Sequence, residues 1–557
     1  MKTRHIAALA VSGLTAVVIA PTAGYAATAS SSTHIAAGSA HRPSTAVSKS
    51  DTFQKNVVHS RPSATVAGLT AALTATETGA ESFGFDATGS TDTPPATITG
   101  YSIDFGDGST PQTNTTGTFN YKYAWAGTYT ATVTVTDSAS TTTTASVTIT
   151  TGGSDYTPYG PTRILDTRTG TGAPAAAVGP NGVLKLTVAG AGTAGNLIPT
   201  GVTAVAMNVT VTGPTRAGFI TAFPDGTAAP NASNLNYGTG ETIPNLVVVQ
   251  VGPDGVVDLQ NSSAGSVQLV ADVVGYYSQT KASQYVSISP YRLLDTRTGT
   301  GTSGLIKQIP ANTSITVPVG GADGNTIPAS GVTAIAANIT ATNPRSNGFI
   351  TAYPSGESLP NASNVNYGHN QTVANMADVP VGSDGQIVIH NTSSSSVDVV
   401  IDVSGYFTDL VNAGTGVATD SYLPTAPLRW LDTRTSSWGY GPLQPYWYYY
   451  QLGAYSTDSG VTSMVINATV TDTQHNGFLT LYPVNTQTAN DIPNASNLNF
   501  AAGQTVANLA FVPLGTTPLG DGSSPSDGFI GYWFGAYNAS NGSTDLVLDQ
   551  EGLFFDN

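Results

Sequence analysis

The chain contains no cysteine and very little charge. Only 9% of its 557 residues are charged, against about 25% in an average protein. Without cysteine there can be no disulfide, no thiolate nucleophile, no Cys-ligated zinc site and no iron–sulfur cluster. The 18 Lys and Arg face 34 Asp and Glu, so the chain lacks the basic surface that nucleic-acid binding requires. Seven Lys and five Glu are too few for long charged helices.

Long apolar runs are missing except near the start. Residues 1–5 are basic, Ile6–Ile19 is apolar, and small residues follow with cleavage sites after Ala26 or Ala29. This pattern predicts a secretory signal peptide over 1–29, because its apolar run is too short to span a bilayer. No later run is long enough to span, and no sorting motif closes the chain. We therefore expect a secreted protein, either extracellular or held non-covalently at the cell surface.

Residues 30–64 are rich in Ser, Thr, Ala and His and show almost no apolar periodicity. This composition predicts a disordered linker. His34, His41 and His59 are spaced too widely for a metal tract, and we expect neither a metal nor a cofactor.

Strict alternation of apolar and polar residues begins after Thr65. It is clearest in Tyr129–Asp137 and in 145–151, and it predicts short antiparallel strands that are buried on one face. Residues 85–92 (FDATGSTD), 104–109 (DFGDGS) and 123–137 (YAWAGTYTATVTVTD) resemble the PKD domain, an Ig-like module.

The resemblance covers 65–152 and implies a spacer or weak binding accessory in a secreted or surface protein. Backbone geometry explains its Asp-Gly turns, because Gly adopts positive φ and Asp caps the turn. Calcium binding through Asp104 and Asp107 is the alternative.

The rest of the chain repeats with a period of about 130 residues, which is the length of a whole domain. Arg-x-Leu-Asp-Thr-Arg occurs at 163–168, 292–297 and 429–434, and Pro-Asn-Ala-Ser-Asn at 230–234, 360–364 and 493–497. Single asparagines also recur, at Asn208, Asn338 and Asn467 and at Asn245, Asn375 and Asn508.

Period-two alternation within each copy predicts β-sandwiches of eight to ten strands at 156–280, 285–408 and 422–557. The expected fold class is all-β: one Ig-like PKD domain followed by three larger jelly-roll-like or Ig-like sandwiches. The sequence leaves open whether the copies form a rod or fold back on each other.

The arrangement resembles a repeat family of exported actinobacterial proteins. In that family an R-x-L-D-T-R element opens each unit and a D-V-x-G-Y-F-like strand closes it. The resemblance implies an envelope or matrix context and leaves the activity open.

The hexapeptides hold six of the 11 Arg residues. In an extended strand, Asp166 and Arg168 share one face, which predicts an ion pair that stabilises the first strand. A site that grips a sugar or a carboxylate is the alternative. The other charged residues of the three hexapeptides are Arg163 in the first, Arg292, Asp295 and Arg297 in the second, and Arg429, Asp432 and Arg434 in the third.

The Pro-Asn-Ala-Ser-Asn segments are identical in all three copies. Their polar side chains suit an Asx-type turn or hydrogen bonds to sugar hydroxyls. The candidate ligand-binding asparagines are Asn231, Asn234, Asn361, Asn364, Asn494 and Asn497.

Four of the five Trp residues lie in the third copy. Aromatic faces pack well on sugars, so Trp438, Trp447, Tyr449 and Trp533 are candidate glycan-binding residues. Bulky filling of a divergent terminal copy is the alternative.

Catalysis has little support. His369, His390 and His475 do not recur at matching positions, so no Ser-His-Asp triad is repeated, although a glycosidase carboxylate pair remains open. We expect no enzyme, but a secreted binding or adhesion protein for cell-wall or matrix polysaccharide or an envelope protein. Repetition would then raise avidity. The alternatives are a self-assembling surface or sheath protein, an accessory subunit of a separately encoded polysaccharide hydrolase, and a hydrolase of unknown type.

Overall fold

The computed structural model describes residues 57–59, 65–410, 418–435, 441–456, 460–486, 491–517, 519–520 and 530–556. The predicted signal peptide, nearly all of the predicted linker and Trp438 lie outside the described residues. All described residues belong to one compact unit, 38–557.

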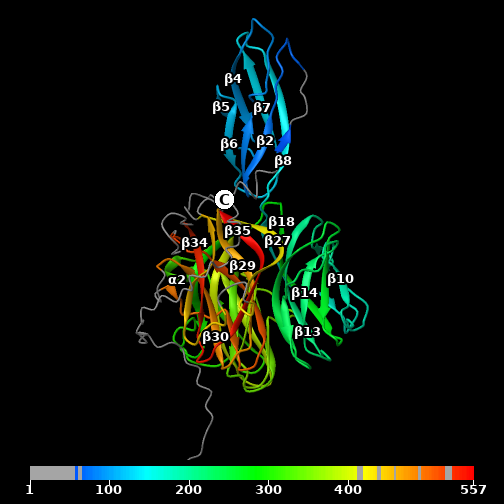
Figure 1. Cartoon of the computed structure of the whole chain (residues 1–557), viewed down its shortest axis with the longest axis vertical. Coiled ribbons are helices and arrows are strands. Elements are labelled where there is room, and N and C mark those ends of the chain that lie inside the picture. The colour runs from blue at the N-terminus through cyan, green and yellow to red at the C-terminus, as the bar shows by residue number, and fades with distance from the viewer. Residues whose placement is uncertain are drawn as a thin grey trace, which may run out of the picture. The chain divides into compact units, whose positions relative to one another are not determined.

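The first domain is a sandwich of two four-stranded antiparallel sheets, drawn in blue to cyan in Figure 1. One sheet has the order β1-β2-β3-β6 and the other β5-β4-β7-β8. Alternate residues of its strands are buried, as period-two sequences require. The strands are β1 (Val57–His59), β2 (Thr74–Gly79), β3 (Ser82–Asp86), β4 (Ile98–Asp104), β5 (Gln112–Asn114), β6 (Thr118–Lys122), β7 (Thr128–Asp137) and β8 (Thr142–Thr150).

The Asp-Gly turn of this domain is capped by its own carboxylates. Asp104 Oδ1 accepts a hydrogen bond from the Gly106 amide at 2.9 Å, and Asp107 Oδ1 accepts one from the Ser109 amide at 3.0 Å. Gly106 and Gly108 have φ of 80° and 85°, a conformation that glycine adopts without strain.

Each of the three copies is a jelly roll. In copy 1, four hairpin-like pairs join the first strand to the last, the second to the next-to-last, and so on inward: β9 with β18, β10 with β17, β13 with β16, and β14 with β15. Folding this paired ribbon over itself produces two four-stranded sheets, β16-β13-β18-β9 and β10-β17-β14-β15. Copies 2 and 3 repeat the same order, and the predicted all-β fold class is confirmed.

The strands of copy 1 are β9 (Asp155–Asp166), β10 (Val183–Thr187), β11 (Gly192–Thr193), β12 (Asn196–Leu197), β13 (Val202–Thr212), β14 (Gly218–Pro224), β15 (Leu235–Tyr237), β16 (Ile243–Gln250), β17 (Val256–Ser262) and β18 (Gln268–Ser278). Those of copy 2 are β19 (Gln284–Asp295), β20 (Thr313–Pro318), β21 (Val332–Thr342), β22 (Gly348–Pro354), β23 (Val365–Tyr367), β24 (Val373–Pro380), β25 (Gln386–Ser393) and β26 (Asp398–Thr408). Copy 2 also contains a single helical turn, α2 (Ala322–Asn325).

Those of copy 3 are β27 (Asp420–Asp432), β28 (Tyr448–Ser456), β29 (Val461–Thr471), β30 (Gly477–Val484), β31 (Leu498–Phe500), β32 (Val506–Pro513), β33 (Leu519–Gly520), β34 (Ile530–Asn538) and β35 (Asp545–Asp556).

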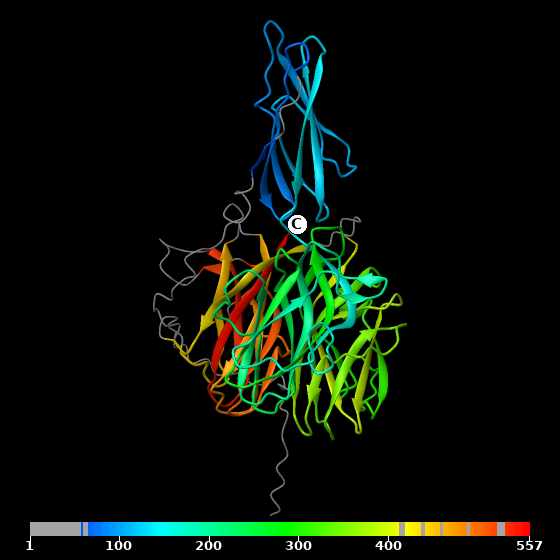
Figure 2. The same ribbon diagram turned by 90° about the vertical axis from the view of Figure 1, so that its right-hand side faces the viewer.

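The three copies pack around a common axis and form a closed ring, called here the three-copy ring. The equivalent strands β16, β24 and β32 contact one another pairwise. Figure 2 shows the copies side by side in green, yellow-green and orange-red. Backbone bridges link the first strands of the copies in the same cyclic way, through Tyr156 with Ser283, Tyr285 with Asp420, and Ser154 with Tyr422.

A separate apolar core fills the axis of the ring and draws residues from all three copies. Equivalent tyrosines, Tyr156, Tyr285 and Tyr422, lie in it with Phe407 and other fully buried rings. Tyr156 stacks on Phe407 with ring centroids 4.0 Å apart, and Tyr285 on Phe554 at 4.2 Å. The copies therefore bury sheet faces that a rod of separate domains would expose.

Candidate functional site

Two sets of equivalent asparagines connect each copy to its neighbours. The side-chain amide of Asn208 donates to the carbonyl of Ser363 in copy 2. Asn338 makes the same bond to Ser496 in copy 3, and Asn467 makes it to Ser233 in copy 1, which closes the ring.

The second set bonds to the first across each interface. Asn245 Nδ2 donates to Asn467 Oδ1 at 2.9 Å, Asn375 to Asn208 at 2.8 Å and Asn508 to Asn338 at 2.9 Å. The Oδ1 atoms of this second set accept from backbone amides of the adjacent copy, at Leu246, Met376 and Leu509. The amide donors are thus satisfied in a buried interface, where an unpaired one is costly.

The Arg-x-Leu-Asp-Thr-Arg elements lie beside these interfaces. Arg163 donates to Asp272 through two bonds of 2.8 and 3.1 Å, a bidentate geometry. Arg168 pairs with Asp166 at 2.7 Å. A β-bulge in β9 opposite Asp272 also brings Arg163 to 3.5 Å from Asp166.

The ion pairs shift their carboxyl groups in opposite directions. The Arg168 hydrogen bond lowers the pKa of Asp166 below its usual value. Burial raises the pKa of Asp272, although the Arg163 guanidinium opposes that rise. Equivalent pairs occur in the other copies: Arg292 with Asp402 and Asp295, Arg297 with Asp295, Arg429 with Asp549 and Asp432, and Arg434 with Asp432.

The Pro-Asn-Ala-Ser-Asn segments meet these carboxylates from the adjacent copy. The Ser233 amide donates to Asp549 at 3.2 Å, and the Ser496 amide to Asp402 at 3.4 Å. The aspartate of the closing strand, Asp402 or Asp549, therefore links the hexapeptide arginine of its own copy to the Pro-Asn-Ala-Ser-Asn segment of the adjacent copy.

The side chain of the last asparagine in each segment bonds to the backbone of a neighbouring strand in its own copy. Oδ1 of Asn234 accepts from the Ala222 amide at 2.7 Å, and Asn364 and Asn497 make the equivalent bond. Asn234 also donates to Glu551 at 2.9 Å. Among the six candidate asparagines, Asn231, Asn361 and Asn494 are exposed to solvent.

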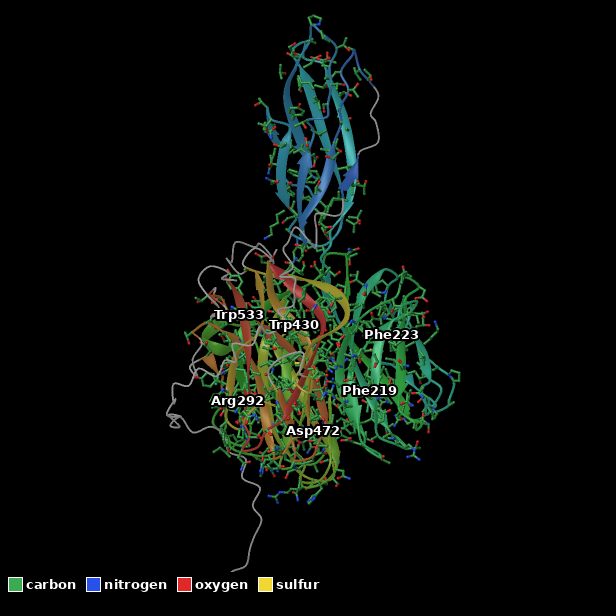
Figure 3. All side chains as sticks on the ribbon, viewed as in Figure 1. Phe219, Phe223, Arg292, Trp430, Asp472 and Trp533 are labelled. Atoms are coloured by element: carbon green, nitrogen blue, oxygen red, sulfur yellow. The ribbon has the colours of Figure 1, made fainter. Side chains whose placement is uncertain are left out.

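The aromatic candidates of copy 3 do not form one cluster. Trp533 on β34, labelled in Figure 3, is buried with Tyr482 and Val484. Tyr449 is half-buried, and its hydroxyl accepts a hydrogen bond from the Gln444 amide at 2.9 Å. Of the described Trp candidates, only Trp447 is well exposed.

Trp447 lies beside Tyr446 in a tight turn, and these two residues are called here the turn patch. Their exposed fractions are 41% and 55%. The turn is held by bonds from the Tyr446 amide to the Ser540 carbonyl at 3.0 Å and from the Asn538 amide to the Trp447 carbonyl at 3.1 Å. The two rings are thus carried on a hydrogen-bonded backbone.

Tyr446 has a φ of 52°, in a region where bulky residues are rare. Its turn follows Leu443, which occupies the position of Val178 and Ile309 in the other copies, as their backbone bridges show. The residues equivalent to Tyr446 are therefore Asn181 and Asn312, with φ of 52° and 49°.

Comparison with known proteins identifies one module. Residues 59–151 match the family model of the PKD domain. This part of the chain is a PKD domain. The predicted PKD resemblance is therefore confirmed for this segment, and such domains are typical of extracellular proteins.

No curated protein matches the sequence. Among solved structures, the chain is similar to one from a study of carbohydrate-binding modules of the β-sandwich superfamily, with 20% identity and a TM-score of 0.15. That match covers 35% of this chain and 91% of the other.

It is also similar to chains of the Sulfolobus turreted icosahedral virus and of an archaeal virus with a triple jelly roll fold. Both chains are 11% identical to this protein, and each match covers 75% of it. The matches cover 88% and 87% of the viral chains, with TM-scores of 0.14 and 0.15 respectively. TM-scores this low support no inference about function.

Within the described segments, no group of three or more His, Asp or Glu residues is arranged to hold a metal ion. The same residues include no helix that is long and apolar enough to cross a membrane.

Reasoning from the sequence missed the strained position of Tyr446. The signal was present in the repeats, because Pro180-Asn181 and Ala311-Asn312 correspond to Pro445-Tyr446. A bulky residue in place of Asn just before a strand indicates a turn with a strained backbone.

Proposed function

We propose that the protein is an exported binding and adhesion protein without catalytic activity. It attaches through the turn patch of copy 3 to polysaccharide of a cell wall or matrix. The PKD domain and the jelly-roll copies fit a binding role. The single observation that carries the proposal is the positive φ of Tyr446.

A left-handed conformation costs an L-residue roughly 1–2 kcal/mol, and Asn tolerates it better than bulky residues do. Copies 1 and 2 place Asn at this position, whereas copy 3 places an exposed Tyr there and a Trp next to it. Strain of this kind persists where function requires it. Two adjacent aromatic rings held out to solvent suit stacking on the apolar faces of sugars.

The location of the titratable groups supports binding without catalysis. Within the ring, the carboxyls Asp378 and Glu551, whose pKa values are strongly raised, are fully buried, where no polymer could reach them. The repeated Arg–Asp pairs are engaged with each other at the copy interfaces.

The test exchanges the turn of copy 3 for that of copy 2. The double variant Tyr446→Asn/Trp447→Thr places the residues of Asn312 and Thr313 in the equivalent turn, so the backbone should be relieved rather than strained. The mature protein is sedimented with insoluble cellulose, chitin and peptidoglycan, and the bound fraction is measured. We expect wild type to bind at least one polymer and the double variant to lose at least 90% of that binding.

The matched control is Leu305→Ser/Ile306→Ser in copy 2. These neighbours are 61% and 66% exposed, so the control removes a comparable exposed apolar pair elsewhere, and binding should be unchanged. Equal loss in both variants, or no binding by wild type, would refute the proposal. Concentration-dependent assembly on sizing chromatography would then favour a self-assembling surface protein.

A further inference from the structure

The carboxyl of Glu81 joins the PKD domain to copies 2 and 3 of the ring and lies near Asp155 of copy 1. Glu81 lies in the turn between β2 and β3 and is fully buried. The Ser421 hydroxyl donates to its Oε1, and Gln284 Nε2 approaches its two oxygens at 3.3 and 3.5 Å. The same Gln284 nitrogen donates to Asp155 at 3.2 Å.

Asp155, Gln284 and Ser421 are equivalent residues of the three copies. Each immediately precedes one of the axial tyrosines, Tyr156, Tyr285 and Tyr422, whose hydroxyls bond equivalent backbone carbonyls. One carboxyl of the PKD domain therefore meets the end of the ring axis, where a single position from each copy converges. These four residues are called here the axial clamp.

Three hydrogen bonds that involve backbone groups lie next to the clamp residues. The Gly153 amide donates to the Ala80 carbonyl at 2.9 Å, and Gln279 donates to the Thr151 carbonyl at 2.6 Å. The Ala282 amide donates to Asp155 at 3.1 Å. Loss of the clamp would free these neighbouring bonds, which provides a local readout.

The clamp is enclosed and acidic. Burial raises the pKa of Glu81 to about 8, with a further contribution from the charge of Asp155. Burial also raises the pKa of Asp155 to about 6. Lys122 of β6 opposes the first shift, and Lys281, which lies 4.1 Å from the Trp125 ring, opposes the second.

Other titratable groups face the same region. Burial raises the pKa of Tyr129 on β7, and the charges of Glu81 and Asp155 raise it further. Burial raises the pKa of Asp420 on β27 to about 7, with a contribution from Asp556 of β35, and Lys122 opposes the rise. Acidic groups therefore outnumber the two lysines here.

We propose that the axial clamp is a proton-dependent lock between the PKD domain and the three-copy ring. Protonated Glu81 is neutral and can both donate and accept in the enclosed site. Once Glu81 and Asp155 are ionised, two like charges face each other out of water, and the contact opens. Both acids hold their proton more tightly in the closed state, so closure is favoured in acid and lost as pH rises through about 6 to 8.

The experiment follows amide hydrogen exchange of the full mature chain between pH 5 and pH 9, corrected for the intrinsic pH dependence. In wild type, exchange at the Gly153 and Ala282 amides should rise at least tenfold. In Glu81→Gln, a neutral residue of the same shape, the rise should stay below threefold. Asp155→Asn is a second variant and should also reduce the rise.

The matched control is Asp378→Asn, which neutralises a buried acid inside the ring whose carboxyl makes no hydrogen bond to any clamp residue. It should leave the rise at Gly153 as large as in wild type. An equal rise in wild type and Glu81→Gln would overturn the proposal, as would the absence of any rise in wild type. So would simultaneous loss of protection at the ring asparagines, because the whole chain would then be opening.

Discussion

Asp378 offers the sharpest test of how the ring is stabilised. It lies on β24 among the axial aromatic residues, fully buried, and neither carboxyl oxygen has a hydrogen-bond partner among the described residues. The equivalent residues of the other copies are Val248 and Phe511, as the strand registers show. Copy 2 therefore has an acidic side chain at a position where copies 1 and 3 have an apolar one.

Burial raises the pKa of Asp378 from 3.8 to about 8. The native state therefore keeps its proton between these values, whereas the unfolded state releases it, and stability falls as pH rises. One such group lowers the stability by roughly 3 kcal/mol between pH 5 and pH 7. At pH 7 the accumulated cost relative to a group with its ordinary pKa is about 4 kcal/mol.

The change to Asp378→Val copies the side chain of copy 1 and removes this cost. We expect a rise in Tm of about 4 °C or more at pH 7 and a smaller gain at pH 5. Asp378→Asn keeps the shape and a polar group but cannot ionise, so it should remove the pH slope without the full gain. Tryptophan fluorescence measures unfolding, because four of the five Trp lie in copy 3.

Asp254→Asn is the control, because this carboxylate is exposed on the surface of copy 1. It should leave Tm and its pH dependence unchanged. If Asp378→Asn melts with the same dependence on pH as wild type, Asp378 is already ionised in the native state, and the reasoning from burial fails.

Two further predictions concern the copy interfaces and the axis. Asn467→Leu removes the bonds to Ser233 and Asn245 and leaves buried polar groups unpaired. It should therefore destabilise the ring by about 2–5 kcal/mol in thermal melts, and an unchanged Tm would show that water replaces these bonds. Gly405→Ala would place a methyl group 2.1 Å from the Tyr285 hydroxyl, whereas Gly179→Ala meets no atom within 4 Å. The first should lower Tm by several degrees and the second should not, and equal Tm values would contradict the close packing on the axis.

Short-range patterns predicted the local architecture well. Alternation such as Tyr129–Asp137 determines a strand, because side chains of a strand point alternately to the two faces of its sheet. The all-β class and the PKD domain follow from such segments, and both are confirmed. The domain boundaries, the export signal and the ligand-binding residues stay predictions.

The repeats alone could not show whether the copies are separate or joined. Asn245 and Asn467 are 222 residues apart, and in the sequence each is simply a polar residue that recurs. Only the closed ring shows that they are partners. It also shows that the aspartates paired with Arg292 and Arg429 accept hydrogen bonds from the Pro-Asn-Ala-Ser-Asn segment of the adjacent copy.

The sequence by itself thus determined the strands, the three jelly-roll-like units and the scarcity of charge, because these depend on neighbours along the chain. Only the tertiary structure decided which polar groups are enclosed and which are presented to solvent. The same Asn or Asp is a surface residue in a rod of domains and a buried partner in a ring. Its solvation, and with it its chemistry, is set by residues more than a hundred positions away.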